Sequence, residues 1–422
     1  MSKVKYIFIL FLLMTILVSC QKNSGKSSDH ITNAEQEDIS ITHILESKEG
    51  AKMKDSIEVN PTTNLYNTLP IIEEEQISEN TISPIRDITS IELIKEIKIG
   101  WNLGNTLDAT GDEGINSEIS WGNPFTAKEN IDKVKDAGFN IIRIPTTWEN
   151  HLVSESKISE SWLNRTREIV DYAIDNNMYV ILNLHHEQWH YPSYENLEAA
   201  KEMLTALWTQ IGNHFMAYDE HLIFEGLNEP RMYNTEYEWT SGTIESRDVI
   251  NQLNKTFIDT IRNLEGNNPL RHLMIPPYAA SSNPDAWTDF FVPDDDKLIV
   301  SIHGYTPYDF ALNPDGSSTF SPENKNDTKE IDWLMENIHT NFISKGIPVI
   351  IGEFGARDKN NIESRIAWSE YYVRKATEIG IPCIWWDNGS FIGDGENFGL
   401  LDRRNNTWVF QNIIDSLMSG LN

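Results

Sequence analysis

Eight short runs of β-branched and apolar residues, separated by amphipathic stretches, organise this 422-residue sequence from about residue 86 onward. Such runs predict strands, because branched side chains pack well on a pleated surface. The predicted strands cover residues 97–103, 140–144, 179–184, 222–227, 272–275, 298–302, 349–352 and 383–386. Eight strands alternating with helices over about 335 residues predict an α/β fold, a (β/α)8 TIM barrel.

The stretches between these runs carry the signals that start and end helices. Predicted helices cover residues 127–137, 162–176, 197–218, 247–264, 329–345 and 362–379, and a last one lies near 409–418. Residues 89–92 and 126–129 have the spacing of capping boxes, in which a threonine and a glutamate satisfy free amide groups. Gly138, Gly346 and Gly380 lie just past predicted helix ends, where glycine adopts the left-handed conformation that closes a helix.

The chain is strongly acidic, with a formal net charge of −30 and a pI of about 4.7. Such a charge disfavours nucleic acid and anionic membrane surfaces as partners, and it suits a neutral substrate. Of the two cysteines, Cys20 lies in a targeting segment and Cys383 in an apolar strand. We therefore expect no intrachain disulfide, and we expect Cys383 to act as an inert, buried side chain.

Residues 1–20 have the composition of a secretory signal peptide. Lys3 and Lys5 provide the positive start, and the apolar stretch 6–18 is shorter than a membrane span. The sequence LVSC, which ends at Cys20, resembles a bacterial lipobox, where cleavage precedes a cysteine that then carries lipid. We expect a lipid anchor on Cys20 that holds the protein on the outside of the cell envelope. A plain signal peptide is the alternative.

Residues 21–85 show no sustained helical or strand period. They carry 12 acidic residues against 5 lysines and few long apolar runs. A segment of this kind cannot bury enough apolar surface to offset the entropy of ordering it, so we predict an acidic, disordered tether. Its reach would be about 40–50 Å. A small β module is the alternative, and the (β/α)8 domain is expected to cover residues 86–422.

The sequence LIFEGLNEPR, at residues 222–231, places polar residues at the end of a strand. Pro230 has no N–H and cannot extend a buried ladder, so the strand must stop before it. Asn228 and Glu229 then lie at the carboxyl end of a parallel strand, where α/β barrels build their active sites. An isolated Asn-Glu-Pro is equally typical of a solvated loop, so the other strand ends decide between the two interpretations.

Polar and aromatic residues also follow five further strands at the same end of the predicted barrel. They are Arg143, His185, His303, Tyr305, Glu353 and Trp386. A structural role accounts for any one of these side chains, but less easily for all of them at the ends of neighbouring strands. The pattern therefore predicts one cavity with two glutamates, an arginine, histidines and aromatic rings.

Two carboxylic acids that face one cleft are the arrangement that cleaves glycosidic bonds. One acid must donate a proton to the leaving oxygen, while the other must be ionised. Arg143 and the hydroxyl of Tyr305 are expected to hold Glu353 ionised. Burial and the charge of Glu353 are expected to raise the pKa of Glu229. Trp386 offers a flat ring for a sugar face.

A metal site is the competing interpretation, because His185, His186, Glu187 and His190 form a dense cluster. Adjacent side chains on a strand point to opposite faces, so His185 and His186 should not share one ion. We therefore predict neither a metal nor another cofactor. Serine-dependent hydrolysis lacks its nucleophile-elbow signal in this sequence.

Nine stretches between residues 90 and 415 resemble, in order, a family 5 glycoside hydrolase of clan A, closest to its fourth subfamily. They are GWNLGNTLDA (100–109), WGNP (121–124), GFNIIRIPTTW (138–148), LNLHHE (182–187), FEGLNEP (224–230), HGYTPYDF (303–310), IGEFGA (351–356), WWDNG (385–389) and FGLLDR (398–403). The resemblance implies a retaining, double-displacement mechanism. Its acid/base would be Glu229 and its nucleophile Glu353.

The resemblance also implies the residues that surround the cleaved bond. They would be Arg143, His185, Asn228, His303, Tyr305 and Trp386, with Asn228 on the sugar 2-hydroxyl. Trp148, Trp189 and Trp239 would line outer subsites, or would belong to the core or the rim. In a retaining enzyme the two carboxyl groups should lie about 5–5.5 Å apart.

The implied activity is cellulase-type, endo-acting hydrolysis of a β-1,4-glucan backbone by a monomer. Cellulose-like glucan, mixed-linkage glucan and xyloglucan are the expected substrates. A mannanase or xylanase with the same chemistry is the alternative within this enzyme class. A non-catalytic, surface glycan-binding lipoprotein is the alternative from a different class, and the presence of both glutamates argues against it.

Overall fold

The computed structural model describes residues 84–393 and 395–422. The predicted signal peptide, the lipidation residue Cys20 and nearly all of the predicted tether at 21–85 lie outside the described residues. Among the helices that are described, none combines the length and the apolar character that a membrane crossing requires.

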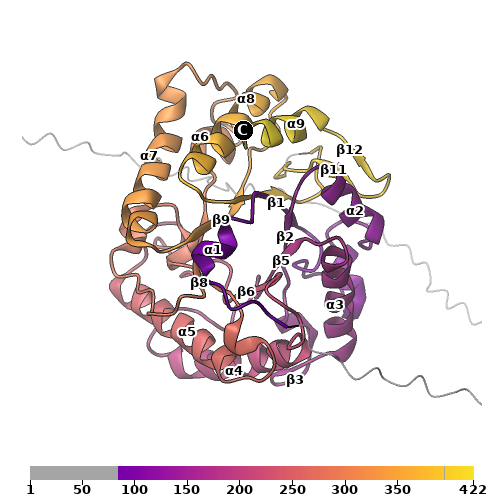
Figure 1. Cartoon of the computed structure of the whole chain (residues 1–422), viewed down its shortest axis with the longest axis vertical. Coiled ribbons are helices and arrows are strands. Elements are labelled where there is room, and N and C mark those ends of the chain that lie inside the picture. Colours follow the sequence, from indigo (N-terminus) through magenta and orange to yellow (C-terminus); the bar gives the residue numbers. More distant parts are fainter. Residues whose placement is uncertain (1–83, 394) are drawn as a thin grey trace, which may run out of the picture. The chain divides into compact units, whose positions relative to one another are not determined.

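Eight parallel strands close into a barrel (Figure 1). They are β1 (Ile99–Leu103), β2 (Ile141–Ile144), β5 (Tyr179–Asn183), β6 (Leu222–Glu225), β7 (Leu273–Ile275), β8 (Leu298–His303), β9 (Val349–Phe354) and β10 (Cys383–Asp387). Each strand pairs with the barrel strands before and after it in the chain, and β10 pairs with β1. The predicted (β/α)8 barrel is confirmed, and each predicted strand end lies within two residues of the observed one.

Helices surround the barrel and connect its strands (Figure 1). The α-helices are α1 (Ser90–Ile94), α2 (Lys128–Asp136), α3 (Glu160–Ile174), α4 (Leu197–His214), α5 (Ile244–Arg262), α6 (Tyr308–Ala311), α7 (Lys325–Asn341), α8 (Ile362–Glu378) and α9 (Gln411–Ser419). Two small hairpins pair β3 (Leu152–Ser154) with β4 (Lys157–Ile158), and β11 (Leu401–Asp402) with β12 (Thr407–Trp408). Short 3₁₀ turns, η4 (Tyr278–Ala280) and η5 (Pro284–Trp287), lie between β7 and β8.

One of the two predicted capping boxes is wrong. The box at residues 89–92 begins α1 as predicted. At α2, Ala127 is the capping residue, and its N–H donates to Asn130 Oδ1 at 3.1 Å. The N–H of Thr126 instead donates to Glu118 Oε1 at 2.6 Å, a contact with a residue outside the four-residue pattern of a capping box. The three predicted helix-ending glycines all have positive φ: Gly138, Gly346 and Gly380.

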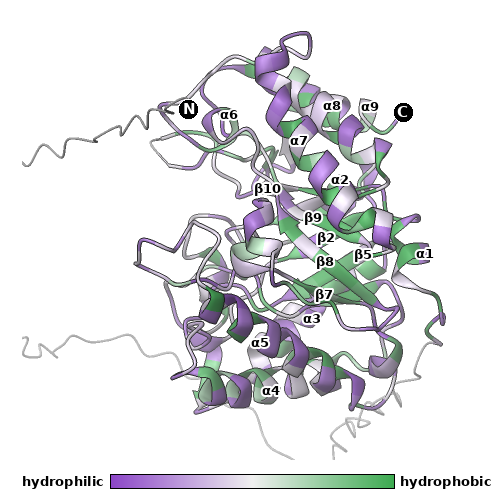
Figure 2. Cartoon of the chain, turned by 90° about the vertical axis from the view of Figure 1, so that its left-hand side faces the viewer, coloured by the Kyte–Doolittle hydropathy of each residue, from purple (hydrophilic) through white to green (hydrophobic). Residues whose placement is uncertain are grey.

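An apolar layer fills the barrel near the amino ends of its strands. Its members are Ile141, Tyr179, Ile181, Ile223, Met274, Ile299, Ile350 and Ile384. Leu93 and Ile94 of α1 pack against this layer and close the amino end. Figure 2 shows α1 at one end of the apolar strands, while long loops extend from the opposite end. Because α1 seals one end, the carboxyl end remains as the place for an open site.

A polar layer lies directly above the apolar one. Side chains two positions apart on a strand point the same way, so the next inward residues follow from the strand period. They are Asn102, Arg143, Asn183, Glu225, Ser301, Gly352 and Trp386. All are buried. The strands thus carry a hydrophobic layer for stability and a polar layer that forms the floor of the candidate site.

Strand β9 departs from strict alternation at the point where it reaches this layer. Ile302 pairs with Ile351, whereas His303 pairs with Glu353, so the register shifts by one residue. Phe354 packs outward against Trp385, with ring centroids 5.6 Å apart. The irregularity turns Glu353 into the barrel, as bulges near active sites commonly do.

Candidate active site

All of the residues predicted to form the site lie on the carboxyl half of the barrel. Arg143, His303, Glu353 and Trp386 belong to strands, while His185, Asn228, Glu229 and Tyr305 follow strand ends. Every one of them is buried or half-buried. The topology therefore brings together side chains that are as far apart as residues 143 and 386 in the sequence.

Glu229, His303 and Glu353 form the centre of the site. One carboxylate oxygen of each glutamate and one imidazole nitrogen lie within 4.8 Å of one another. His303 Nδ1 lies 2.7 Å from Glu229 Oε1 and 3.6 Å from Glu353 Oε2. The side chain of Glu229 is 17% exposed and that of Glu353 is 7% exposed, so Glu229 is the more accessible acid.

Glu353 is held on both of its carboxylate oxygens. Arg143 Nη1 donates to Oε1 at 2.8 Å, and the hydroxyl of Tyr305 donates to Oε2 at 2.8 Å. Both contacts were expected from the sequence. Burial and the charge of Glu353 raise the pKa of Tyr305, so this phenol keeps its proton. The two donors fix the orientation of the carboxylate and offset its negative charge.

A second buried carboxylate, Glu225, supports the arginine and was missed by the sequence analysis. Arg143 Nε donates to Glu225 Oε2 at 2.8 Å. Ser301 and Asn183 donate to the two oxygens of Glu225 at 2.6 and 2.9 Å. Its signal was present in the strand LIFE, because a glutamate at an inward position of a buried strand needs a cationic partner.

Hydrogen bonds fix the orientation of Asn228 and the tautomer of His185. Arg143 Nη2 donates to Asn228 Oδ1 at 2.6 Å, so the Asn228 amide nitrogen faces His185 Nε2, 3.4 Å away. Asn183 accepts from the N–H of Thr146, so its own amide nitrogen donates to His185 Nδ1 at 3.1 Å. Burial lowers the pKa of His185, which keeps the ring neutral with its proton on Nε2. The site thus holds two N–H donors whose nitrogen atoms are 3.4 Å apart.

Trp386 presents its indole beside these donors. Its ring is nearly parallel to that of His185, with centroids 5.8 Å apart and planes 3° apart. A Cβ at Gly104 would lie 2.9 Å from Trp386 Cζ2 and 3.0 Å from the carbonyl oxygen of Asp387. Gly104, in the sequence GWNLGNTLDA, therefore leaves the space that the indole occupies.

Two neighbouring glutamates beside side chains of sugar-binding types are the arrangement of a glycosidase. A comparison of the chain with known protein families identifies the family. The cellulase family, glycosyl hydrolase family 5, has a model that matches residues 107–391. The chain belongs to this family. The membership expected from the motifs is confirmed, and with it the assignment as a cellulase-type hydrolase.

Relatives and solved structures agree with this membership. Endoglucanase B of Neocallimastix patriciarum is 50% identical over 347 residues, which span 80% of this chain and 73% of the relative. A GH5-4 broad specificity endoglucanase from Ruminococcus champanellensis, solved with bound cellotriose, has a TM-score of 0.77 and 48% identity over 80% of this chain and all of that one. A family 5 lichenase from Caldicellulosiruptor sp. F32, solved with cellotetraose, has a TM-score of 0.77 and 42% identity over 81% of this chain and 98% of that one.

The pKa of Glu229 corrects the sequence-based expectation for this family 5 enzyme. Burial raises it, as expected, but the hydrogen bond to His303 and the charges of Arg231 and Arg143 lower it below its usual range. Burial lowers the pKa of His303, but Glu353 and Glu229 raise it above its usual range. The contact between the two side chains thus favours the charged form of each.

The competing metal interpretation fails at Glu187. Its carboxylate accepts the N–H groups of Trp148 at 2.7 Å and Glu149 at 3.1 Å, and the indole N–H of Trp189 at 2.8 Å. These bonds use both oxygens to hold loop backbone beside the site. Glu187 therefore does not join His185 and His186 as a ligand.

The expectation that His185 and His186 point to opposite faces is wrong. Both residues follow the end of β5, where strand alternation no longer applies, and their rings meet edge to face at 4.5 Å. One ligand atom of each, together with one of Asp108, lies within 4.8 Å of the others. The oxygens of Asp108 already accept the N–H groups of Asn105 and Thr106 at 3.0 and 2.7 Å.

The three tryptophans considered for outer subsites have different positions. Trp148 is fully buried in the core, which excludes contact with substrate. Trp189 is half-buried and bound to Glu187. Trp239 is 65% exposed on the loop after β6, so of the three it is the one that presents an open ring.

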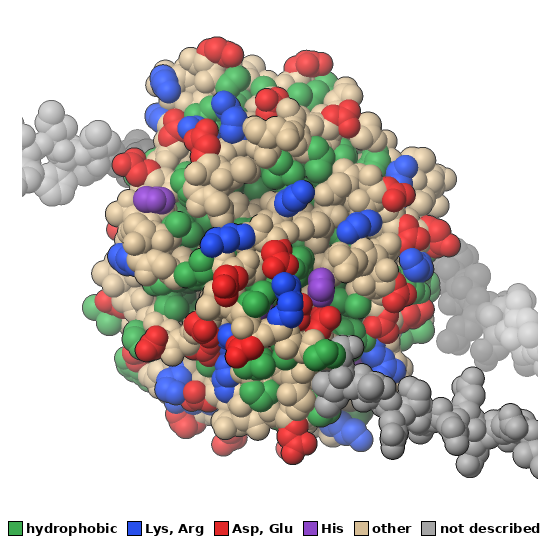
Figure 3. Space-filling view, in the orientation of Figure 1, with side chains coloured by type: hydrophobic (Ala, Val, Ile, Leu, Met, Phe, Trp, Pro, Cys, Tyr) green, Lys and Arg blue, Asp and Glu red, His purple; other side chains and the backbone are tan. Residues whose placement is uncertain are grey.

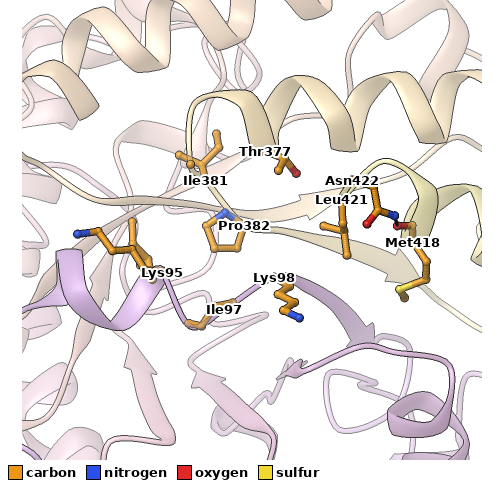
Figure 4. Close-up of a pocket in the computed structure, with 11 residues that line it drawn as sticks. Lys95, Ile97, Lys98, Thr377, Ile381, Pro382, Met418, Leu421 and Asn422 are labelled. Atoms are coloured by element: carbon orange, nitrogen blue, oxygen red, sulfur yellow. Dashed lines mark hydrogen bonds between the residues drawn. The ribbon is translucent and has the colours of Figure 1, made fainter.

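A separate cavity of about 450 Å³ lies at the amino end of the barrel, between α1 and the ends of α8 and α9 (Figure 4). Ile94, Ile97, Ile381 and Pro382 are among its apolar lining residues, and Lys95 and Lys98 are its cationic ones. None of the described side chains that line it is a carboxylate or an imidazole. Figure 3 looks onto this amino-terminal face, where acidic and basic side chains gather around α1. The cavity lacks the groups that glycosidic cleavage requires.

Proposed function

We propose that this family 5 enzyme cleaves internal β-1,4 bonds of glucans with retention of configuration. The carrying observation is that carboxylate oxygens of Glu229 and Glu353 lie within 4.8 Å of each other. Retaining enzymes place the two carboxyl groups about 5–5.5 Å apart, whereas inverting enzymes leave about 6.5–9.5 Å for a water molecule. The names of the relatives, endoglucanase and lichenase, support a glucan as substrate.

In the first step, an oxygen of Glu353 forms a bond to the anomeric carbon while the glycosidic C–O bond breaks. Glu229 gives its proton to the departing oxygen, so that the leaving chain ends in a hydroxyl group. Glu229 must carry its proton before this step, and His303 Nδ1, 2.7 Å from Glu229 Oε1, is placed to exchange a proton with it. The products are a glycosyl ester on Glu353 and an ionised Glu229.

In the second step, Glu229 accepts a proton from a water molecule. The water oxygen bonds to the anomeric carbon, the ester bond to Glu353 breaks, and both glutamates return to their starting states. The low pKa of Glu229 favours this step, because the general base must be ionised.

The surrounding side chains orient the sugar at the cleaved bond. The N–H groups of Asn228 and His185, 3.4 Å apart, are placed to donate to the 2-hydroxyl group. Such bonds strengthen as charge develops on the sugar ring. Trp386 offers the flat apolar surface on which the sugar face stacks.

The roles of the two glutamates are tested by Glu353→Gln and Glu229→Gln. Each variant should lose at least about 10³-fold in kcat on a soluble β-glucan, because covalent and acid/base catalysis are each removed. A fluorinated, mechanism-based glycoside should label Glu353 in the wild-type enzyme. Unchanged melting temperatures would show that the fold persists. Wild-type turnover in either variant would contradict the assignment.

Substrate preference is tested on a panel of soluble polysaccharides with analysis of product length. We expect the highest rates on unbranched β-1,4-glucan and mixed-linkage glucan, and we propose xyloglucan as a further substrate. A mixture of early oligosaccharide products would identify endo-acting cleavage. Highest activity on mannan or xylan would favour those alternatives, and glycan binding without release of reducing ends would favour a non-catalytic role.

We further propose that the enzyme acts as a monomer, exported and anchored by lipid on Cys20 to the outside of the cell envelope. The proposal rests on the charged start, the apolar stretch and the LVSC sequence at the amino terminus. Cys20→Ala should abolish incorporation of labelled fatty acid and release the enzyme into the medium. Incorporation that persists in Cys20→Ala would contradict the anchor.

A further inference from the structure

We propose that Arg231 is a positioning residue for this reaction: packed against two aromatic rings, it holds Glu229 and controls when that carboxylate carries its proton. The inference rests on the proposed role of Glu229 as acid/base. Arg231 comes two residues after Glu229, in the loop that leads from β6 to α5. Its side chain is 15% exposed and turns back toward the site.

Two aromatic rings pack against the guanidinium of Arg231, and we call them the clamp. Its central carbon lies 4.4 Å from the ring centroid of Tyr233 and 4.1 Å from that of Trp239. Stacking on aromatic rings suits the planar guanidinium of arginine far better than the ammonium of lysine. The clamp therefore limits where the charge can lie.

The edge of the guanidinium points toward the acid/base. Arg231 Nη1 donates to the carbonyl oxygen of Glu229 at 3.0 Å and lies 3.4 Å from Glu229 Oε2. On its other side, Arg231 Nε contacts Glu238 Oε1 at 3.3 Å. His303 contacts Oε1, so each of the two carboxylate oxygens of Glu229 has a polar partner.

The loop after β6, which carries the clamp, is anchored by hydrogen bonds to Tyr278 and Ala279. The hydroxyl of Tyr278 accepts the N–H of Met232 at 3.0 Å and donates to the carbonyl of Tyr237 at 2.8 Å. The N–H of Ala279 donates to the carbonyl of Pro230 at 2.9 Å. These bonds hold the loop on either side of Arg231, so that the position of the guanidinium is set before substrate binds.

A fixed positive charge at this point affects the two steps in opposite ways. It favours ionised Glu229, which the second step needs as a base, and it disfavours the protonated form that the first step needs as an acid. The position of Arg231 therefore sets the pH range over which both steps proceed. The other charged or titratable groups that act on Glu229 are Arg143, His186, Tyr233, His303, Tyr305 and Glu396, and Glu353 lies beside it.

The test is the pH dependence of kcat/KM for Arg231→Met on a soluble β-glucan. Removing the charge should raise the pKa of Glu229. The alkaline limb of the profile of kcat/KM against pH should therefore move to a higher pH by about one unit. Arg231→Lys should bring the limb part of the way back to its wild-type position, because lysine keeps the charge without the stacking. Trp239→Ala should move the limb in the same direction by less, because one of the two rings that hold Arg231 is lost.

Arg247→Met is the matched control, because Arg247 supports the same loop without contacting Glu229. Its guanidinium donates to the carbonyls of Ser241 and Gly242 at 3.0 and 3.3 Å and pairs with Asp289 at 2.8 Å. We expect an unshifted alkaline limb in this variant. A uniform fall in kcat/KM without a shifted limb in Arg231→Met, or the same shift in Arg247→Met, would overturn the proposal.

The failure of this inference is distinguishable from the failure of the proposed function. If Glu229→Gln is inactive while Arg231→Met keeps the wild-type limb, Glu229 remains the acid/base and Arg231 has only a structural role. If Glu229→Gln keeps wild-type turnover, the acid/base assignment itself is wrong, and the proposal for Arg231 is overturned with it.

Discussion

The two ends of the barrel are made from the same strands, yet they differ in what their inward side chains do. At the amino end, the inward positions are mainly isoleucines, and Leu93 and Ile94 of α1 pack against them. One layer higher, Arg143 and Glu225 lie fully buried with oppositely charged partners. The comparison shows that a buried charge is tolerated two residues from the apolar core when each of its polar atoms has a partner.

Strand β6 shows this difference between two successive inward positions. Ile223 and Glu225 point in the same direction, one into each layer. The lower residue contributes by removing apolar surface from water, whereas the upper one contributes by holding Arg143 for Glu353. Substitutions at these two neighbouring positions should therefore separate stability from catalysis.

The largest effect is expected for Glu225→Leu at the polar layer. The variant removes one of the two carboxylates of Arg143, and loss of one partner of a buried pair costs about 3–5 kcal/mol. We expect that loss in the free energy of unfolding from denaturant titration, with kcat reduced more than about 100-fold as Arg143 shifts. Glu225→Gln, which keeps the shape and loses the charge, is the control. Full activity in Glu225→Leu would show that the layer is not needed for catalysis.

A comparable loss of stability without loss of activity is expected for Ile223→Ala at the apolar layer. Ile223 is fully buried, and truncation of such a side chain costs about 2–5 kcal/mol. Below the melting temperature, kcat/KM should stay within about two-fold of the wild type, since Ile223 belongs to the apolar layer and not to the site. A large change in kcat/KM would show that the two layers are coupled.

A smaller, pH-dependent effect is expected at His272, which ties β7 to α1. His272 Nδ1 lies 2.8 Å from Ser90 Oγ, and burial lowers the pKa of His272 to about 4. Since an unfolded histidine titrates near pH 6.5, stability is present above that pH and is lost as the pH falls toward 4, by up to about 3 kcal/mol. His272→Phe should reduce the slope of the unfolding free energy against pH by the amount that corresponds to about one proton.

The measurement is the free energy of unfolding between pH 4.5 and 7.5. His303, at the other end of the barrel, should affect the pH dependence of stability in the opposite direction. Its folded-state pKa is raised by Glu353 and Glu229, so its contribution is lost as the pH rises. An unchanged slope in His272→Phe would mean that other buried histidines account for the acid sensitivity. His151, His190 and His214 also have pKa values lowered to about 4.

The smallest effect is expected for Gly104→Ala beneath Trp386. The new Cβ would lie 2.9 Å from the indole, so the ring must move by a few tenths of an ångström. KM for oligosaccharides should rise about 3–10-fold while kcat changes less. At Gly395, in the loop after β10, an added Cβ meets nothing within 4 Å, so Gly395→Ala is the control. Equal KM values for the two variants would rule out this role of Gly104.

The strands, the helices and the polar strand ends were predictable because each depends on residues that are near in sequence. The two-residue period of LIFE and IIRI places side chains by itself, and Pro230 ends a strand by its own chemistry. Glu225 was missed even though its signal lay in the same strand. Its partner Arg143 is 82 residues away, and no local pattern links the two.

By itself, the sequence determined the barrel, its family and the two glutamates that face each other, since strand ends of a parallel barrel meet at one face. Only the tertiary structure decided which groups act on Glu229, because His303 and Arg231 reach it from β8 and from a folded-back loop. The register shift in β9 turned Glu353 inward, and it is a property of pairing between strands. Electrostatic energies depend on distances through space, and those distances exist only once the chain has folded.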